Sequence, residues 1–270
     1  MSTPLWFVSI IRRTFPFSRA AARLTRLPLV GRAAGWMLFD GDDIMLLPRT
    51  VAVTEDIMDG PQEVVPWQVL EHFVERGSFM WVMDECICRR SMKCKDYPVD
   101  LGCLFIGEAA RKINPALGRQ VSKQEALEHL ARCREAGLFH LVGKNKLDAV
   151  WLNVRPGEKL LTICSCCTCC CLWRFLPDLS ASLASVLERM PGLEIKVTED
   201  CVGCETCLEA KCLAGAVSVV DGRAVISGDC RGCGRCVELC PNGAITMTFE
   251  GVDDPLAGAI ERLENKVDVS

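Results

Sequence analysis

Apolar residues recur along the middle of the chain with two different periods, which predicts both helices and strands. Between Pro66 and Gly77, four apolar residues lie at helical spacing: Val69, Leu70, Phe73 and Val74. This spacing predicts a helix that the glycine ends. The short apolar runs Phe79–Met83 and Leu160–Ile163 predict strands. A third run, Leu104–Ile106, follows Gly102-Cys103 and is expected to be helical.

Sequence signals at both ends predict a second helix. Ser122 and Glu125 form a capping box, and Gly137 provides a C-terminal stop. Cys133 falls on the same face of this helix as Ala126 and Leu130. We therefore expect Cys133 to be a small core residue and not a metal ligand.

The first 62 residues are predicted to form a basic arm followed by short strands at Ile44–Leu47 and Val51–Thr54, with turns at Asp40-Gly41 and Asp59-Gly60-Pro61. Residues 1–35 contain no acidic residue and six arginines: Arg12, Arg13, Arg19, Arg23, Arg26 and Arg32. Such a segment, with aromatic residues interleaved, suits an anionic membrane surface. The other interpretation is an arm that docks on the protein or on a partner subunit. Pro16 and Pro28 favour this second interpretation, because they break any long helix.

The cysteine count changes this picture of an ordinary mixed chain. The 270 residues include 19 cysteines, an odd number that fits a secreted disulfide scaffold poorly. The apolar run Leu5–Ile11 precedes Arg12 and Arg13, whereas a signal peptide places its positive charge first. We therefore expect a reducing, cytoplasmic compartment. The net charge of −4 argues against nucleic acid as a partner.

Eight of the cysteines belong to a repeat in the last third of the chain. The triplet Cys201, Cys204 and Cys207 recurs 29 residues later as Cys230, Cys233 and Cys236. A fourth cysteine follows each triplet, Cys212 in the first copy and Cys240 in the second. The second copy has the spacing of the bacterial two-cluster ferredoxin run, including its final proline. The first copy has one extra residue before Cys212, and Leu213 in place of the proline.

This spacing predicts two [4Fe–4S] clusters with crossed ligands. A triplet on a tight loop binds three irons of one cluster, whereas the fourth cysteine reaches the other cluster. One set is therefore Cys201, Cys204, Cys207 and Cys240, and the other is Cys230, Cys233, Cys236 and Cys212. Zinc is the alternative, but its sites usually contain two Cys-x2-Cys pairs. Between the motifs, Val217–Val220 and Ala224–Ile226 predict a hairpin.

Ten further cysteines occur in two N-terminal blocks: Cys86, Cys88, Cys94 and Cys103, then Cys164, Cys166, Cys167, Cys169, Cys170 and Cys171. Each block follows one of the predicted strands Phe79–Met83 and Leu160–Ile163, and pairing of these strands would bring both blocks to one end of a sheet. We predict one or two additional iron–sulfur clusters there. Nearby cations, among them Arg89 and Arg90, would stabilise anionic sulfur. The alternative is a reactive or structural thiol patch.

The predicted fold class is α+β, in four blocks. These are a basic arm with short strands (1–62), a cysteine-rich α/β domain with a metal site (63–192), a two-cluster ferredoxin-like domain (193–250) and a charged tail (251–270).

Several segments together resemble a known family: 86–90, 97–98, 102–107, 118–119, 122–127, 135–138 and the octet 164–171, followed by the paired cluster motifs. In these segments the chain is similar to the ferredoxin-type 4Fe–4S dicluster-domain proteins, found mostly in anaerobic bacteria and archaea. The resemblance covers roughly residues 63–250. It implies electron-transfer iron–sulfur chemistry and redox partner proteins, and it leaves the reaction open.

The sequence favours an electron carrier or the electron-input subunit of an anaerobic redox system. It contains no dinucleotide fingerprint and no phosphate loop. His72, His129 and His140 are isolated from one another. Two other functions remain open: an iron–sulfur oxidoreductase that binds substrate at an N-terminal cluster, and a redox sensor.

Overall fold

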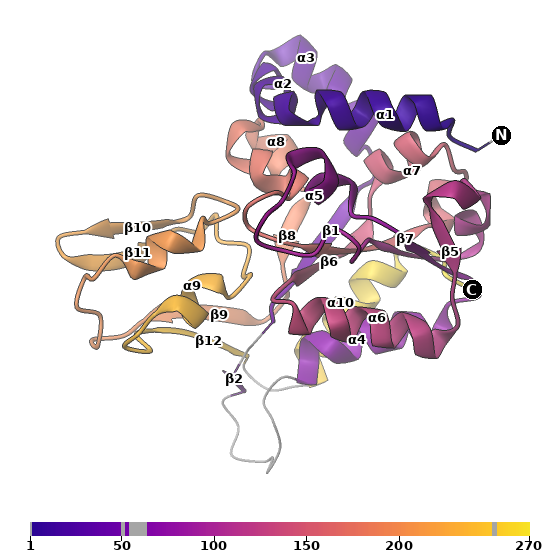
Figure 1. The fold of residues 1–270 in the computed structure, drawn as a ribbon. Helices are drawn as coiled ribbons and strands as arrows, with labels where there is room; N and C mark the ends of the chain where they lie inside the picture. The colour runs from indigo at the N-terminus through magenta and orange to yellow at the C-terminus, as the bar shows by residue number, and fades with distance from the viewer. Residues whose placement is uncertain (1, 50–51, 54–63, 250–252) are drawn as a thin grey trace.

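The computed structural model describes residues 2–49, 52–53, 64–249 and 253–270, and its fold is α+β, as predicted (Figure 1). A seven-stranded sheet has the order β5-β3-β4-β7-β6-β1-β8. Its strands are β1 (Asp43–Leu47), β3 (Met80–Met83), β4 (Leu104–Ile106), β5 (Gly118–Gln120), β6 (Phe139–Lys144), β7 (Leu161–Cys166) and β8 (Leu187–Arg189). All neighbouring strands are antiparallel except β1 and β8, which are parallel.

Helices cover both faces of this sheet, because strand side chains alternate between the faces. On β1, Met45 and Leu47 join the core under α4 (Val64–Arg76), α6 (Lys123–Glu135) and α10 (Asp253–Glu264). Ile44 and Leu46 point to the opposite face. The helical segments on that face are α1 (Leu5–Thr14), α2 (Ser18–Leu24), α3 (Pro28–Ala34), α7 (Lys146–Leu152), the 3-10 turn Leu172–Asp178 and α8 (Ala181–Ala184).

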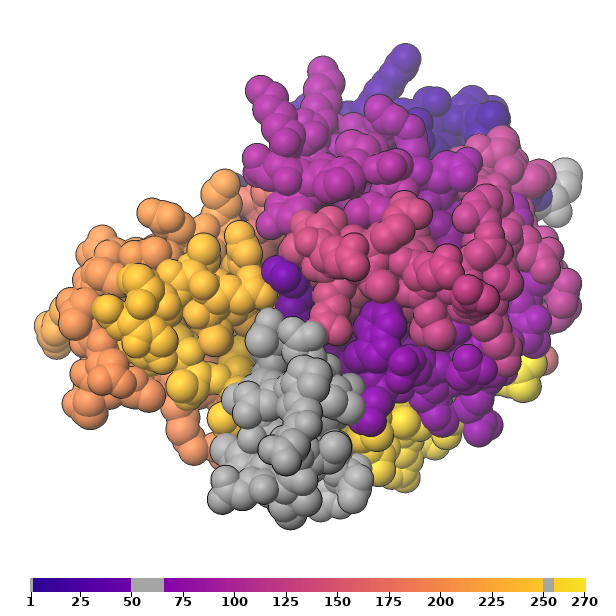
Figure 2. Space-filling model, turned by 60° about the horizontal axis from the view of Figure 1, so that its bottom comes forward, coloured from indigo at the N-terminus to yellow at the C-terminus, as the bar shows by residue number. Residues whose placement is uncertain are grey.

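Residues 193–249 form a lobe beside this body (Figure 1). The lobe contains β9 (Leu193–Val197), the hairpin β10 (Val217–Val220) and β11 (Arg223–Ile226), α9 (Arg235–Leu239) and β12 (Ile245–Phe249). The short strand β2 (Ala52–Val53) pairs with β12 in a three-stranded sheet of order β2-β12-β9. Figure 2 shows the lobe in space-filling form, with residues that follow it along the chain visible at the lower edge of the body.

Most elements predicted from the sequence are present. The helix that contains Val69 and Phe73 is α4, and α6 begins with the expected capping box at Ser122. The predicted strands correspond to β3 and β7, and the hairpin to β10–β11. Cys133 is completely buried in the core. Of the predicted arm turns, Asp59-Gly60-Pro61 lies outside the described residues.

Two expectations need correction. Leu104–Ile106 is the strand β4 and not a helix, because its three buried residues pair with β3 on one side and β7 on the other. The strands β3 and β7 therefore do not pair directly. Both are antiparallel to β4, so they run parallel to each other, and their C-terminal ends lie at the same edge of the sheet.

The sheet of the body joins residues of two predicted blocks. It contains β1 from the block 1–62 and six strands from the block 63–192. The expected charged tail forms α10, whose Ala259 and Leu263 are completely buried in the main core. Its apolar residues pack into this core, and Arg262 and Glu264 add ion pairs to the body. Among the described residues, no helix is both long and apolar enough to cross a bilayer.

Candidate metal centres

The lobe brings each predicted crossed set of cysteines together. One cavity is lined by Cys201, Cys204, Cys207 and Cys240. A second cavity is lined by Cys212, Cys230, Cys233 and Cys236. Each cavity thus receives three sulfurs from one motif and the fourth from the other motif.

The backbone around these cavities suits an anionic cluster. Amide groups donate hydrogen bonds to the sulfurs, from Ala224 to Cys201 (3.3 Å) and from Ala244 to Cys240 (3.3 Å). Gly203, in the first loop, has a φ of +67°, and a Cβ atom there would lie 2.1 Å from the Gly222 carbonyl oxygen. Only glycine fits this approach. The cysteine sets and their amide donors therefore fit a four-iron cluster in each cavity.

The protein surroundings of the second cavity disfavour the thiolate form of its cysteines. Burial, and then the neighbouring sulfurs, raise the pKa of Cys233 to about 12. Burial raises the pKa of Cys236 to about 12 in the same way. Four thiolates in this space need a cation among them, and iron supplies the charge that deprotonates such groups.

Six N-terminal cysteines form a second candidate centre, here called the six-sulfur group: Cys86, Cys88, Cys103, Cys164, Cys166 and Cys171. They meet where β3 and β7 end and β4 begins. The Sγ atoms of Cys103 and Cys164 are 3.3 Å apart, as are those of Cys166 and Cys171. Cys164 and Cys166 are two residues apart on β7, so they share a face of that strand.

The α5 helix (Ile87–Met92) completes the six-sulfur group. Cys86 is its N-cap residue and Cys88 lies in its first turn. The Cys88 thiol hydrogen-bonds to the Cys86 sulfur, which lowers the pKa of Cys86. The same hydrogen bond and burial raise the pKa of Cys88, and the charges of the nearby Cys171 and Cys166 raise it further.

The remaining four N-terminal cysteines form a separate, tighter cluster, here called the four-sulfur group: Cys94, Cys167, Cys169 and Cys170. Their Sγ atoms all lie within 4.8 Å of one another, and those of Cys94 and Cys169 are 3.6 Å apart. The sequence predicts that the two blocks together build one or two clusters, without assigning cysteines to either. The structure separates Cys166 from Cys167, as strand alternation suggests, but keeps Cys169 and Cys170 together.

Arg89 lies between the two groups and is completely buried. It donates from Nη1 to the Ser165 carbonyl oxygen (2.8 Å) and from Nη2 to the Leu101 carbonyl oxygen. Burial alone would lower the pKa of Arg89, but the negative charges of the nearby sulfurs outweigh burial and raise this pKa. These sulfurs belong to Cys86, Cys103 and Cys166 of the six-sulfur group and to Cys167 of the four-sulfur group. Arg89 is thus a fixed positive charge shared by both groups.

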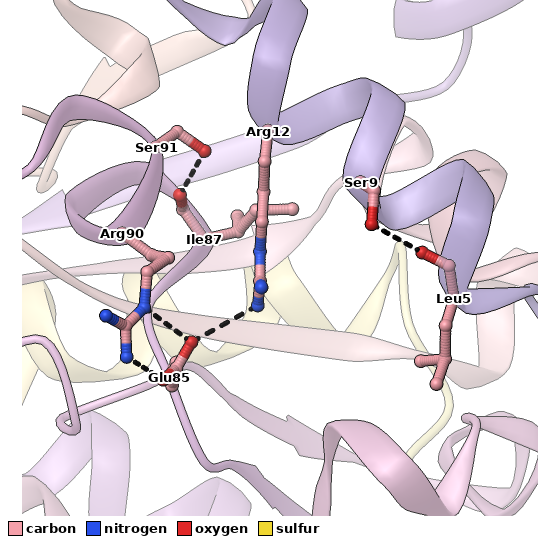
Figure 3. A network of polar contacts seen from close by, with 7 residues as sticks. All are labelled: Leu5, Ser9, Arg12, Glu85, Ile87, Arg90 and Ser91. Atoms are coloured by element: carbon pink, nitrogen blue, oxygen red, sulfur yellow. Dashed lines mark hydrogen bonds and ion pairs between the residues drawn. The ribbon is translucent and has the colours of Figure 1, made fainter.

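Neighbouring arginines in the sequence have different roles in the structure. Arg90 is exposed and pairs with Glu85, which also accepts a hydrogen bond from Arg12 of α1 at 3.2 Å (Figure 3). This contact fixes α1 beside the start of α5. The sequence grouped Arg89 with Arg90 as nearby cations and missed the burial of Arg89. No local signal separates the two arginines, because the positions three and four residues after Cys86 lie on the same side of a helix.

Comparison with known proteins supports the chemistry of the lobe. A family model described as a 4Fe–4S binding domain matches residues 224–246, which include Cys230, Cys233, Cys236 and Cys240. No curated protein and no solved structure matches the chain. The match and the cysteine groups together indicate an iron–sulfur protein, with a general role in electron transfer.

Proposed function

We propose that the chain is a ferredoxin-type electron-transfer protein that works as a carrier or as an electron-input subunit in the cytoplasm of an anaerobe. It holds two [4Fe–4S] clusters in the lobe and further iron–sulfur chemistry at the six-sulfur group. The observation that carries this proposal is the pair of cavities with crossed cysteine sets. Bound clusters of this kind supply one-electron transfer.

The position of the two cavities supports a relay between a partner protein and the body. The first is lined only by residues of the lobe, and at its rim Cys204 is exposed and Val202 is 70% exposed. The second cavity includes Leu46 of β1 in its lining. One cavity is thus accessible to a redox partner protein, while the other lies against the body that contains the six-sulfur group.

A crossed-ligand substitution tests the proposal. In the full chain, reconstituted without oxygen, Cys240→Ser should remove the cluster held by the first motif, Cys201 to Cys207, because Cys240 lines that cavity. Iron and acid-labile sulfide should each fall by about four per chain, or a three-iron cluster should replace the four-iron one. The measurements are metal and sulfide content and electron paramagnetic resonance of the reduced protein.

Cys133→Ser is the matched control, since Cys133 is buried but lines neither cavity. It should leave iron, sulfide and the resonance spectrum unchanged. Loss of the signal of the Cys230–Cys236 motif in Cys240→Ser, with the first motif intact, would show that the ligands are not crossed. Zinc in place of iron in the lobe would contradict an electron-transfer function.

A further inference from the structure

The four-sulfur group is too compact for a cluster of the kind proposed for the lobe. Four thiolates around one tetrahedral ion with bonds of about 2.3 Å lie about 3.8 Å from one another. The sulfurs of Cys94, Cys167, Cys169 and Cys170 are all within 4.8 Å, and the Cys94–Cys169 pair is at 3.6 Å. A four-iron cluster places a different iron behind each thiolate and so holds its thiolates farther apart.

The lobe provides an internal comparison of size. Its two crossed sets of cysteines line separate cavities. Within the described parts of the chain, only the four-sulfur group brings three or more potential ligand atoms within 4.8 Å of one another. The same chain therefore contains two cluster-sized cysteine sets and one ion-sized set.

The surroundings of the four-sulfur group are those of a closed structural site. The backbone amide groups of Asp96 and Tyr97 donate hydrogen bonds to the Cys94 sulfur. Hydrogen bonds of this kind hold the sulfur ligands of bound metals in place. Cys167 and Cys170 are buried, and Cys94 and Cys169 are half-buried. All four positions around a central ion are occupied by protein sulfur, which leaves no open position for a substrate.

We infer that Cys94, Cys167, Cys169 and Cys170 bind one tetrahedral metal ion, zinc or mononuclear iron, separately from the iron–sulfur chemistry of the six-sulfur group and the lobe. Four thiolates are the ligand set of structural zinc and of single-iron sites. The inference rests on sulfur geometry and does not depend on the proposed electron-transfer function.

Such an ion would join the loop after α5 to the turn that follows β7. Cys169 and Tyr97 also line a groove between body and lobe, together with Lys211 and Arg235 of the lobe. The ion therefore fixes the surface of the body that faces the lobe. Its contribution is structural.

The test compares two variants of the full chain, supplied with iron, sulfide and zinc without oxygen. Cys169→Ser should lose about one metal ion per chain and no acid-labile sulfide. Cys166→Ser, in the six-sulfur group, should lose iron and sulfide together. Cys133→Ser is the control in the same apolar cluster and should lose neither.

X-ray absorption of the unsubstituted protein gives an answer even if Cys169→Ser fails to fold. The expected result at the zinc edge is one zinc with four sulfur neighbours at about 2.3 Å and no second metal nearby. The same inference is supported if Cys169→Ser contains one iron fewer than the wild type and the same amount of acid-labile sulfide. Equal loss of iron and sulfide in Cys169→Ser, or four freely titrating thiols in this group, would overturn it.

A different observation points to a second property, at the N-terminus. Ten of the sixteen exposed large hydrophobic side chains of the described residues lie between residues 5 and 37: Leu5, Trp6, Ile10, Phe17, Leu24, Leu27, Leu29, Val30, Trp36 and Met37. They belong to α1–α3 and the turns between and after them, which lie together at the outer side of the body (Figure 1). No residue of α3 is buried. A patch of this extent indicates a binding surface.

The charge of this surface identifies its partner as an anionic lipid bilayer. Residues 1–35 carry six arginines and no acidic residue. Arg12 pairs with Glu85, and Arg19 and Arg23 pair with Asp178. Arg13 and Arg32 are exposed and make no ion pair with the described residues. We propose that α1–α3 rest on the headgroup region of an anionic bilayer, with the apolar side chains inserted and the free arginines at the phosphates.

Vesicle sedimentation tests this second proposal. The full chain should bind vesicles of phosphatidylcholine mixed with phosphatidylglycerol, and bind vesicles of phosphatidylcholine alone much more weakly. Leu29→Glu, at a residue that is 81% exposed, should weaken binding by roughly tenfold or more. Val150→Glu, at a 48% exposed position of α7, should not. Equal binding to both kinds of vesicle, or binding only to a protein partner, would overturn the proposal.

Discussion

Arg89 offers the sharpest test of how the body controls its cysteine groups. Replacing it with glutamine keeps a polar side chain of similar length and removes one positive charge that is completely buried. The carbonyl oxygens of Ser165 and Leu101 would each lose a charged donor. The surrounding sulfurs would lose their shared counter-charge.

The expected magnitudes follow from burial. Removing one partner of a buried charge pair costs about 3–5 kcal/mol. The loss of the charge should also change the reduction potential strongly. Two unit charges roughly 6 Å apart interact by about 3 kcal/mol at an effective dielectric constant of about 20. For a one-electron couple this corresponds to a potential more negative by on the order of 100 mV, since each tenfold change in equilibrium is about 59 mV.

The assay is an anaerobic redox titration followed by electron paramagnetic resonance, together with guanidinium unfolding. Arg89→Gln should lower the potential of the N-terminal centre and leave the potentials of the lobe nearly unchanged. Arg90→Gln is the matched control, because Arg90 is exposed and its field is screened by water. Unchanged N-terminal potentials and unchanged stability in Arg89→Gln would refute the assignment of Arg89 as the shared counter-charge.

Two further predictions concern the backbone of the lobe and a buried carboxyl group of the body. Gly203→Ala should destabilise the lobe by about 2 kcal/mol and lower its iron content. Gly228→Ala should be close to neutral, because a Cβ atom at Gly228 meets nothing within 4 Å. Unfolding curves and iron counts of both variants check this prediction. Burial raises the pKa of Asp42 from 3.8 to about 7. The contribution of this carboxyl group to the free energy of unfolding is therefore complete below pH 3.8, and it is lost as the pH rises through 7. Asp42→Asn should therefore be neutral near that lower pH and stabilise the chain by up to about 4 kcal/mol at about pH 8, measured by unfolding at both values. A gain that does not change with pH would contradict the reasoning.

Local sequence signals were sufficient for much of the fold. The capping box at Ser122 and the apolar spacing around Phe73 are short-range features, and both helices are present. Leu104–Ile106 was misassigned, because three apolar residues have no resolvable period, and their strand pairing depends on β3 and β7. The C-terminal helix was missed for a similar reason: its burial depends on distant residues of α4 and the sheet.

The candidate sites show the same division between local and distant information. In the lobe, cysteine spacing alone predicted the crossed sets, and the structure places them around two cavities. In the body, spacing could not show that Cys94 joins Cys167, 73 positions later, while Cys103 joins Cys164. That partition depends on the strand order of the sheet, which no single motif encodes.

The packing of α10 has a consequence for the order in which the protein is made. Leu263 and Val267 complete the core beneath α4, and the Ser78 amide donates to the Val269 carbonyl oxygen at 2.9 Å. These residues follow the lobe along the chain, so the ribosome synthesises the lobe, with its eight cysteines, before the body can close. Closure of the body is therefore one of the last steps in the folding of the chain. The N-terminal cysteines remain in an incomplete core until α10 has been synthesised and has packed beneath α4.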